Sequence, residues 1–161
     1  MKVRELMTVG AASVKSDESL SNAAWHMWNC DCGAIPVVDG STDRVVGMIT
    51  DRDICMATWT KDRAPSTIPI SDAMSRSLFH CGPEDDVSVA EELMRAKQIR
   101  RIPVLDRDSK LVGILSLADI VTRSQSAGTR PAARELAPTE ITATLANICQ
   151  PWPTRPQNAT V

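Results

Sequence analysis

A tandem repeat spans most of this 161-residue chain. The segment from Met7 to Ile54 recurs as the segment from Met74 to Ile120, with the first motifs 67 positions apart and the last motif 66 positions apart. The spacing shortens by one residue in the turn between two strand-like runs. Each copy is a small unit that cannot cover its own apolar face, so the two copies are expected to pack together. Any site that one copy builds is therefore expected to occur twice.

The first copy shows alternating strand and helix patterns. One apolar helical face is predicted by residues at positions i, i+3, i+4, i+7 and i+8, namely Leu20, Ala23, Ala24, Met27 and Trp28. In chain order we expect a strand over 12–14, this helix, strands over 34–38 and 45–50, and a helix over 51–59.

The second copy repeats this order. We expect a strand over 78–81, a helix over 86–98, strands over 101–105 and 111–116, and a helix over 117–124. The chain then divides into a first unit over 1–59, a polar linker over 60–69, a second unit over 70–124 and an extension over 125–161. In the extension, 139–149 predicts one short helix, followed by a proline-rich tail that excludes further helix. An isolated helix of that length is marginal in water, so it should dock on the core or on a second chain.

The composition excludes several classes of function. Hydrophobic residues make up 43% and charged residues 24% of the chain, which are ordinary values for a globular protein. With a net charge of −2 and only 3% aromatic residues, neither an electrostatic nor a stacking surface for nucleic acid is expected. No apolar run approaches the ~18 residues of a membrane helix, and the N-terminal residues lack the apolar stretch of a secretory signal. We therefore expect a cytoplasmic protein that binds neither nucleic acid nor a membrane.

The five cysteines are odd in number and their spacing is not that of a disulfide framework. Cys30 and Cys32 flank Asp31, which places two thiols and a carboxylate close together. This spacing differs from that of a zinc knuckle, and no second Cys or His pair follows it. We expect reduced, partly buried thiols and no metal site, with a cysteine-based redox or metal sensor as an alternative.

The most informative polar pattern is a hydroxyl three residues before a carboxylate, directly after a strand that contains glycine. It occurs as Thr50-x-x-Asp53 and again as Ser116-x-x-Asp119. Alone, this pattern is typical of a helix capping box, which needs no ligand. A helix N-terminus also offers free backbone donors and a positive dipole end, which favour an anion or a sugar hydroxyl. From the residues alone, both a cap and a binding site remain open.

Several motifs together resemble a known family. The Met7-Thr8 opening, the Ile35-Pro36-Val37 run, the Gly-x-x-Thr/Ser-x-x-Asp turn and the duplication resemble the pair of cystathionine-β-synthase (CBS) domains called a Bateman module. The resemblance covers about residues 3–124 and leaves the C-terminal segment unexplained. It implies an α/β (α+β) fold of two β-α-β-β-α units related by a pseudo-twofold axis. The sheets would pack together with the helices outside, leaving two clefts between the units.

The resemblance also implies that each cleft can hold an adenosyl compound, such as AMP, ADP, ATP, NAD or S-adenosylmethionine. Asp53 and Asp119 would accept hydrogen bonds from the ribose hydroxyls, and Thr50 and Ser116 would reach the ribose or the first phosphate. The adenine would lie against Ala12, Ser13, Cys32, Gly33, Ala34, Ile35, Phe79, His80, Ile99 and Ile102. Guanidinium groups match phosphate geometry, so the phosphates are assigned to Arg52, Arg100 and Arg101.

These expectations describe a regulator and not an enzyme, because no catalytic triad, phosphate-binding loop or metal-ligand cluster occurs in the sequence. The first hypothesis is a stand-alone, non-catalytic sensor that binds an adenine nucleotide, requires no cofactor and regulates an unidentified protein. We expect a homodimer, with candidate contacts at Met27, Trp28, Met56 and Trp59. The alternative is a ligand-free protein-interaction scaffold in which the hydroxyl–acid pairs serve only as helix caps.

Overall fold

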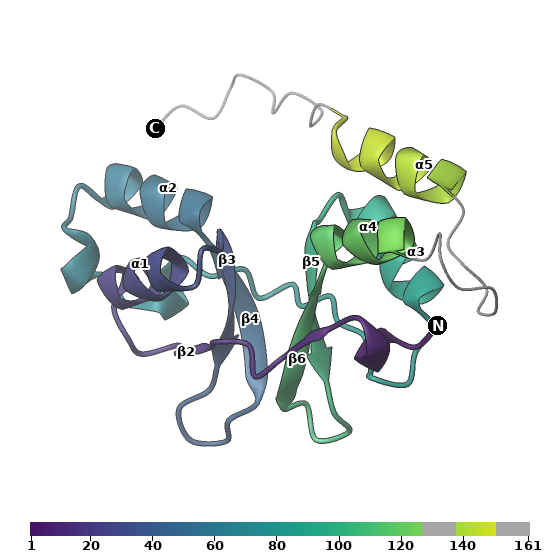
Figure 1. The fold of residues 1–161 in the computed structure, drawn as a ribbon. Helices are drawn as coiled ribbons and strands as arrows, with labels where there is room; N and C mark the ends of the chain where they lie inside the picture. Colours follow the sequence, from purple (N-terminus) through teal and green to yellow (C-terminus); the bar gives the residue numbers. More distant parts are fainter. Residues whose placement is uncertain (127–137, 151–161) are drawn as a thin grey trace.

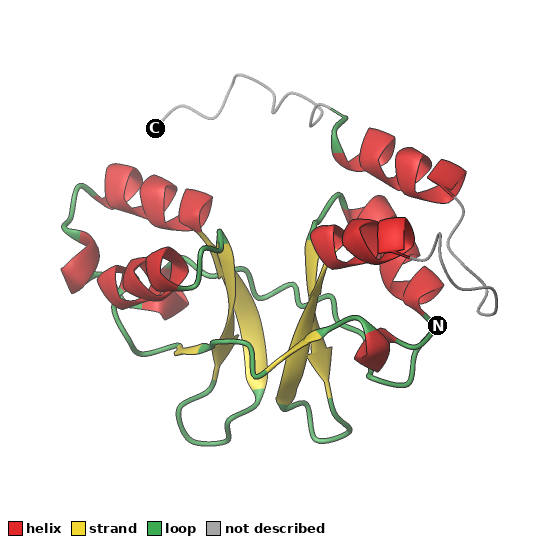
Figure 2. Ribbon diagram, in the orientation of Figure 1, coloured by secondary structure: helices red, strands yellow, loops and turns green. Residues whose placement is uncertain are grey.

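The computed structural model describes residues 1–126 and 138–150. Two three-stranded sheets stand at the centre of the molecule, with helices on their outer sides (Figures 1 and 2). The first sheet has the order β2-β3-β4, formed by Val14–Lys15, Ala34–Val38 and Val45–Thr50. The second has the order β1-β6-β5, formed by Thr8–Val9, Leu111–Ser116 and Arg101–Leu105. The expected α+β fold of two related units is confirmed.

The helices lie on the two outer sides of the molecule (Figure 1). Beside the first sheet lie α1 (Leu20–Asn29) and α2 (Asp51–Lys61), and beside the second lie α3 (Val87–Lys97) and α4 (Leu117–Ser126). A further helix, α5 (Pro138–Ile148), packs against α3. All five helices agree with the sequence prediction to within about two residues at each end, the usual uncertainty of helix boundaries.

The expected strands are less accurate than the helices. The strand expected over 12–14 is displaced to β2, which pairs in parallel with β3. The strand expected over 78–81 is wrong, because in this stretch only Cys81 bridges to β5, at Val104. The residues before Cys81 leave the sheet, and Phe79 lines a cleft instead.

The first helix buries a narrower face than its periodicity predicts. The Ser19 hydroxyl caps α1 by accepting a hydrogen bond from the Asn22 amide at 3.3 Å. Among the five apolar positions, the buried ones are Leu20, Ala23 and Met27. Trp28, which the periodicity places on the apolar face and which is also an expected dimer contact, is 83% exposed. At 3.6 residues per turn it lies about 80° around the helix from Leu20, at the margin of the buried stripe.

Each copy sends its opening segment to the other copy. In the first copy, β1 pairs antiparallel with β6 of the second copy, in the register Thr8 to Ile114 and Val9 to Gly113. In the second copy, Ser75 exchanges two backbone hydrogen bonds with Met48 of β4, at 3.0 and 2.9 Å. The sequence did not predict β1 or this exchange.

The exchange extends into the two main hydrophobic cores. Val3 is fully buried in the core under α3 and α4, which otherwise belongs to the second copy. Ile68, Ile70 and Met74 are buried in the core under α1 and α2, which otherwise belongs to the first copy. Each core is therefore completed by the segment that leads into the opposite copy, so the two copies form one folding unit.

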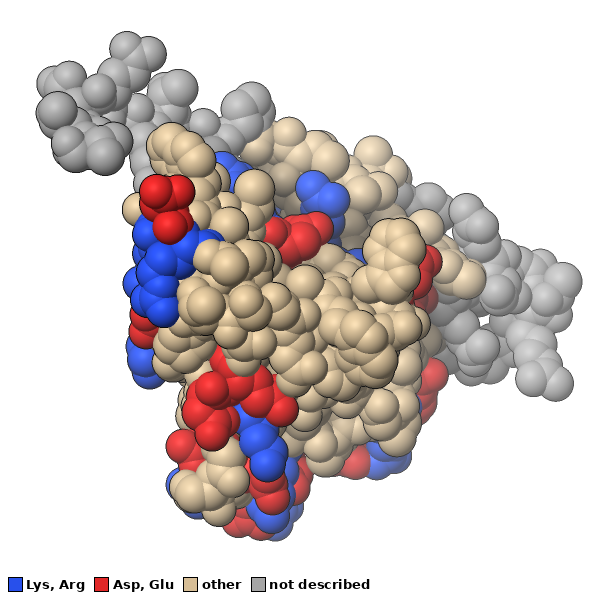
Figure 3. Space-filling view, turned by 90° about the vertical axis from the view of Figure 1, so that its left-hand side faces the viewer, with Lys and Arg blue, Asp and Glu red and all other residues tan. Residues whose placement is uncertain are grey.

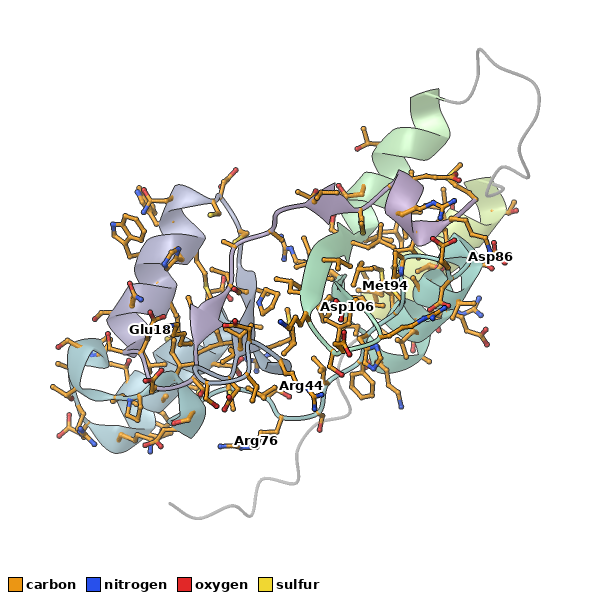
Figure 4. All side chains as sticks on the ribbon, turned by 90° about the horizontal axis from the view of Figure 1, so that it is seen from below. Glu18, Arg44, Arg76, Asp86, Met94 and Asp106 are labelled. Atoms are coloured by element: carbon orange, nitrogen blue, oxygen red, sulfur yellow. The ribbon has the colours of Figure 1, made fainter. Side chains whose placement is uncertain are left out.

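The hairpin turns of the two sheets also touch at the bottom of the molecule. The Val45 amide donates to the Ser109 carbonyl at 2.9 Å, and the backbones of Arg44 and Lys110 form an isolated antiparallel β-bridge. The view from below places Arg44 and Asp106 near the centre, between the two copies (Figure 4). A small third core of Val38, Val45 and Leu105 joins the sheets there.

The expected C-terminal helix docks on the molecule's own second copy. Ile141 and Ile148 of α5 are buried in the second core. The hydroxyl of Thr144, which is fully buried, donates to a carboxylate oxygen of Glu91 on α3 at 2.8 Å. Packing supplies the stability that an isolated helix of this length lacks. The proline-rich tail, residues 151–161, lies outside the described residues.

Glycine in β4 and β6 makes the exchanged crossings sterically feasible. A Cβ on Gly47 would lie 2.4 Å from the Ser75 carbonyl oxygen, and a Cβ on Gly113 would lie 2.8 Å from the Thr8 carbonyl oxygen. Both neighbouring atoms are backbone atoms already held in hydrogen-bonded pairs or strands. Only glycine therefore fits at these two positions without moving a neighbouring strand.

We predict that Gly47→Ala lowers the free energy of unfolding by about 2 kcal/mol, because the added methyl overlaps backbone that cannot easily retreat. Chemical denaturation of the purified variant measures this loss. Gly40→Ala is the matched control, since a Cβ there comes no nearer than 3.6 Å to an Asp17 side-chain oxygen. Equal stability of the two variants would contradict the proposed crossing.

Candidate functional site

Two clefts lie where the copies meet, and we name each after its acidic residue. The Asp53 cleft has a volume of about 510 Å³ and the Asp119 cleft a volume of about 340 Å³. Both volumes fall within the range of small-molecule sites. The number and the placement of the clefts agree with the expectation of a duplicated site between the two units.

The two walls of the Asp53 cleft come from different copies. Thr50 and Asp53, at the start of α2, belong to the first copy. The opposite wall is built from the segments 75–79 and 98–101 of the second copy. Neither copy alone can form this cleft.

The Asp119 cleft has the reverse arrangement. Ser116 and Asp119, at the start of α4, belong to the second copy. The opposite wall is built from the segments 8–12 and 30–36 of the first copy. The exchanged opening segments hold the walls together, because each one pairs with a strand of the neighbouring copy.

Both acidic residues complete a capping box, as the local pattern predicts. At α2, Asp53 Oδ2 accepts from the Thr50 amide at 2.9 Å and from the Thr50 hydroxyl at 2.7 Å, while the Asp53 amide donates back to the Thr50 hydroxyl at 3.2 Å. At α4, Asp119 Oδ2 accepts from the Ser116 amide at 2.7 Å and from its hydroxyl at 2.6 Å, and the Asp119 amide returns a bond of 3.2 Å. The hydroxyl–acid pairs therefore stabilise both helix starts.

Capping leaves half of each carboxylate available. Oδ1 of Asp53 and Oδ1 of Asp119 accept no hydrogen bond from any residue that the structure describes. Both side chains are half-buried and line their clefts. An ionised carboxylate oxygen with open lone pairs can accept from a ligand hydroxyl, in a charge-assisted bond with a net contribution of about 1.5–3 kcal/mol. The cap and a binding role are therefore compatible.

Most of the residues assigned to an adenine pocket do line a cleft. The Asp53 cleft is lined by Gly33, Ala34, Phe79 and Ile99. The Asp119 cleft is lined by Ala12, Cys32, Ala34 and Ile35. Three of the assigned residues line neither cleft, namely Ser13, His80 and Ile102. Ile102 is fully buried in the second core and His80 is exposed, because successive residues of extended chain face opposite sides.

The structure adds lining residues that the sequence did not indicate. In the Asp119 cleft these are Thr8, Gly10, Ala11, Cys30, Asp31, Pro36 and Ile114. In the Asp53 cleft they are Met48, Asp51, Ser75, Ser77 and Gln98. The sequence offered one indication that another segment approaches here, namely a glycine within β4 and within β6. Glycine inside a strand often marks close approach by another backbone.

The three arginines assigned to phosphate gather at one cleft. Arg52, Arg100 and Arg101 all line the Asp53 cleft, although Arg52 comes from the first copy and the other two from the second. Arg101 also lines the Asp119 cleft, where it is the only arginine or lysine among the lining residues. The tertiary fold therefore brings the basic pair of the second copy to the acid of the first.

The cysteines form no metal-binding cluster within the described residues. No group of three His, Cys, Asp or Glu side chains there could hold an ion. Cys30 and Cys32 both line the Asp119 cleft. Burial raises the pKa of the Cys32 thiol, an effect that the Ala34 backbone hydrogen bond partly opposes. Cys32 is therefore a protonated thiol at neutral pH.

No helix within the described residues has the length and apolarity that crossing a membrane requires.

With this geometry established, the chain belongs to the CBS domain family, whose domain pattern matches residues 3–59 and 70–126. The CBS domain-containing protein YhcV of Bacillus subtilis is 37% identical over 124 residues, which are 77% of this chain and 86% of that protein. Hypoxic response protein 1 of Mycobacterium tuberculosis is 33% identical over 117 residues, which are 73% of this chain and 80% of that protein. The predicted tandem CBS pair is confirmed.

Solved structures show the same fold. Hypoxic Response Protein I, solved with two coordinated zinc ions, matches with a TM-score of 0.69 at 30% identity, over 76% of this chain and 98% of that chain. The CBS domain pair of the protein MJ0100, solved with 5′-methylthioadenosine and S-adenosyl-L-methionine, matches with a TM-score of 0.70 over 78% of this chain and 97% of that chain. At 23% identity the second likeness shows the fold alone.

We predict that Cys81 resists alkylation by iodoacetamide in the folded protein near neutral pH. Its thiol is buried, and burial raises its pKa to about 11, so the reactive thiolate forms only as the pH approaches that value. Cys30 and Cys55 are exposed and should be labelled first. Peptide mass spectrometry measures the order, with the denatured protein as the control that labels every cysteine. Labelling of Cys81 as fast as Cys55 in the folded protein would contradict its placement in the core.

Proposed function

We propose that this protein is a non-catalytic regulatory module that binds an adenosyl compound in the clefts between its two CBS units. Binding would shift the shape of the module and thereby alter the activity of a partner protein. A coupling free energy of about 1–3 kcal/mol is typical of such regulation. The existence of a regulated partner, whose identity the sequence does not give, and the cytoplasmic location stay predictions.

One observation carries this proposal: each cleft contains a carboxylate with an open oxygen beside a helix N-terminus. Asp53 and Asp119 already hold their own helix starts with Oδ2, so Oδ1 is presented by a pre-organised side chain. The two cis hydroxyls of a ribose are suitable donors to such an oxygen. The adjoining Phe79 and Ile99 supply an apolar surface for a base in the Asp53 cleft. The ligands named for the MJ0100 domain pair are adenosyl compounds, which supports the same class of ligand here.

The alternative function is a ligand-free scaffold. The complete capping boxes support it, because both acids have a structural role without any ligand. A zinc-binding function is less favoured. The zinc ions of Hypoxic Response Protein I belong to that protein, and the described residues of this chain contain no cluster of three metal-ligating side chains.

We predict that isothermal titration calorimetry detects binding of at least one of AMP, ATP, NAD and S-adenosylmethionine. The double variant Asp53→Ala/Asp119→Ala should weaken that binding by about tenfold or more, because it removes the ribose acceptor from both clefts. The matched control is Asp17→Ala/Asp108→Ala, which removes two exposed acids outside the clefts.

Folding of each variant is checked by its melting temperature, since losing a helix cap costs about 1 kcal/mol. A wild-type protein that ignores all four compounds would refute nucleotide sensing. A double variant that melts earlier but binds as tightly as the wild type would assign the acids to capping alone.

The expected homodimer is also a proposal, and the outer side of the first copy is its proposed interface. Trp25 and Trp28 on α1 are 60% and 83% exposed, and Met56 and Trp59 on α2 are 44% and 69% exposed. We call these four residues the tryptophan surface. Uncharged residues occupy most of this side of the molecule, and charges gather along one edge and the lower end (Figure 3). Met27, also expected as a contact, is 6% exposed and belongs to the first core.

A second copy is the proposed occupant because the second CBS unit shows how such a side is covered. There α5 packs over the outer helices and buries Ile141 and Ile148. The described part of the chain places no helix over α1 and α2 (Figure 1). Two tryptophan surfaces related by a twofold axis would cover each other, and tryptophan is enriched at the centres of interfaces.

We predict that Trp28→Lys shifts the protein toward monomer in sedimentation velocity, because it places a charge in the proposed contact. Val89→Lys is the matched control, since Val89 on α3 is 53% exposed and lies outside the tryptophan surface. A wild-type monomer, or a dimer that both variants retain, would exclude this interface.

A further inference from the structure

The two clefts differ in charge although the fold makes them equivalent. Three arginines and two aspartates line the Asp53 cleft, the aspartates being Asp51 and Asp53. One arginine and two aspartates line the Asp119 cleft, the aspartates being Asp31 and Asp119. The formal charge of the lining residues is therefore +1 in the Asp53 cleft and −1 in the Asp119 cleft.

This difference arises at equivalent positions of the repeat. Arg100 of the second copy corresponds to Gly33 of the first, at a spacing of 67 residues. Gln98 corresponds in the same way to Asp31, and both have left-handed backbone conformations, with φ of 53° and 47°. The backbone is thus repeated while the side chains are not. One position gains a cation and the other an anion, each in a different cleft.

The two clefts also differ in volume and in apolar surface, and the Asp53 cleft has more of both. The Asp53 cleft, at about 510 Å³, is the larger and contains Phe79. The Lys97 ammonium lies 5.0 Å from the centre of that ring, which adds a further cation near this cleft. The Asp119 cleft has a volume of about 340 Å³. At the position equivalent to Phe79 it has Ala12, and no aromatic side chain occurs among its lining residues.

We propose that the two clefts select different classes of adenosyl compound. The Asp53 cleft selects a nucleotide that carries at least one phosphate, and the Asp119 cleft selects a nucleoside-type compound without phosphate, whether neutral or cationic. This inference rests on the proposed function, because it assigns ligand classes to the same clefts.

The selection follows from the unequal cost of placing an anion in each cleft. A phosphate in the Asp53 cleft meets guanidinium groups that match its geometry. A phosphate in the Asp119 cleft meets Asp31 and Asp119, and like charges that are close together repel. A cationic group on the ligand gains from those same two acids.

Arg101 connects the two preferences because it is the only charged residue that lines both clefts. A phosphate bound in the Asp53 cleft attracts its guanidinium. The Asp119 cleft then retains only its two carboxylates, which strengthens its preference for a cation. Nucleotide in one cleft therefore favours a cationic adenosyl compound in the other.

The test weakens one cleft at a time, by one conservative substitution of its ribose acceptor. Asp119→Asn leaves the Asp53 cleft intact, and Asp53→Asn leaves the Asp119 cleft intact. Each variant is titrated with AMP, adenosine and S-adenosylmethionine by calorimetry, after its melting temperature shows that it is folded. We expect Asp119→Asn to bind AMP about tenfold tighter than adenosine, and Asp53→Asn to bind adenosine or S-adenosylmethionine at least as tightly as AMP.

Two further variants test the charges without altering a cap. Arg100→Gln should weaken AMP binding in the Asp53 cleft about tenfold and leave adenosine unchanged. Its control is Arg107→Gln, an exposed turn residue outside both clefts. Asp31→Asn should raise the affinity of the Asp119 cleft for AMP relative to adenosine.

The outcomes separate the two proposals. Binding with the same order of preference in both clefts, or an Arg100→Gln variant that keeps its AMP affinity, overturns the selection alone. No binding of any of the three compounds by the wild-type protein overturns both the selection and the proposed function.

Discussion

The close crossing of backbone at Gly47 and Gly113 is the constraint on which the rest of the structure depends. At these points the opening segment of one copy lies against a strand of the other, too near for any side chain on that strand residue. The crossing completes both main hydrophobic cores with residues from the opposite copy, Val3 in one and Ile70 in the other. It also sets the walls of each cleft, because an acid from one copy then faces a wall from its neighbour. The fold, the cores and the candidate sites are consequences of one exchange.

The hydroxyl–acid pairs show how one side chain can have two roles. A capping box holds Asp53 and Asp119 through Oδ2, and this fixes the position of the other carboxylate oxygen without an additional partner. A binding group that is already held by the fold loses little conformational entropy when a ligand arrives. The hydroxyl–acid pattern is typical of a helix cap, and the same cap holds the carboxylate in a position that supports a binding role.

The two copies share the same backbone fold, but differences in their sequences give the two halves different surfaces. The second CBS unit has its outer side covered by α5, whereas the first carries exposed tryptophans. The cleft linings differ in the same manner, with Arg100 where the first copy has Gly33. Each cleft is assembled from both copies, so a difference in either copy alters the lining of both clefts.

The sequence by itself determined the repeat, all five described helices, and the residues that cap α2 and α4, because these depend on local spacing and on local hydrogen bonds. Only the tertiary structure decided which acid faces which wall. Arg100 and Arg101 are 47 and 48 positions from Asp53 in the chain, and no local pattern relates them. The exchange of β1 has the same origin, because it depends on a contact between the copies, and such contacts form only when two distant segments bury surface together. The strand expected at 78–81 and the cleft position expected for Ile102 failed within the second copy itself, where only Cys81 bridges to β5 and Ile102 faces the core.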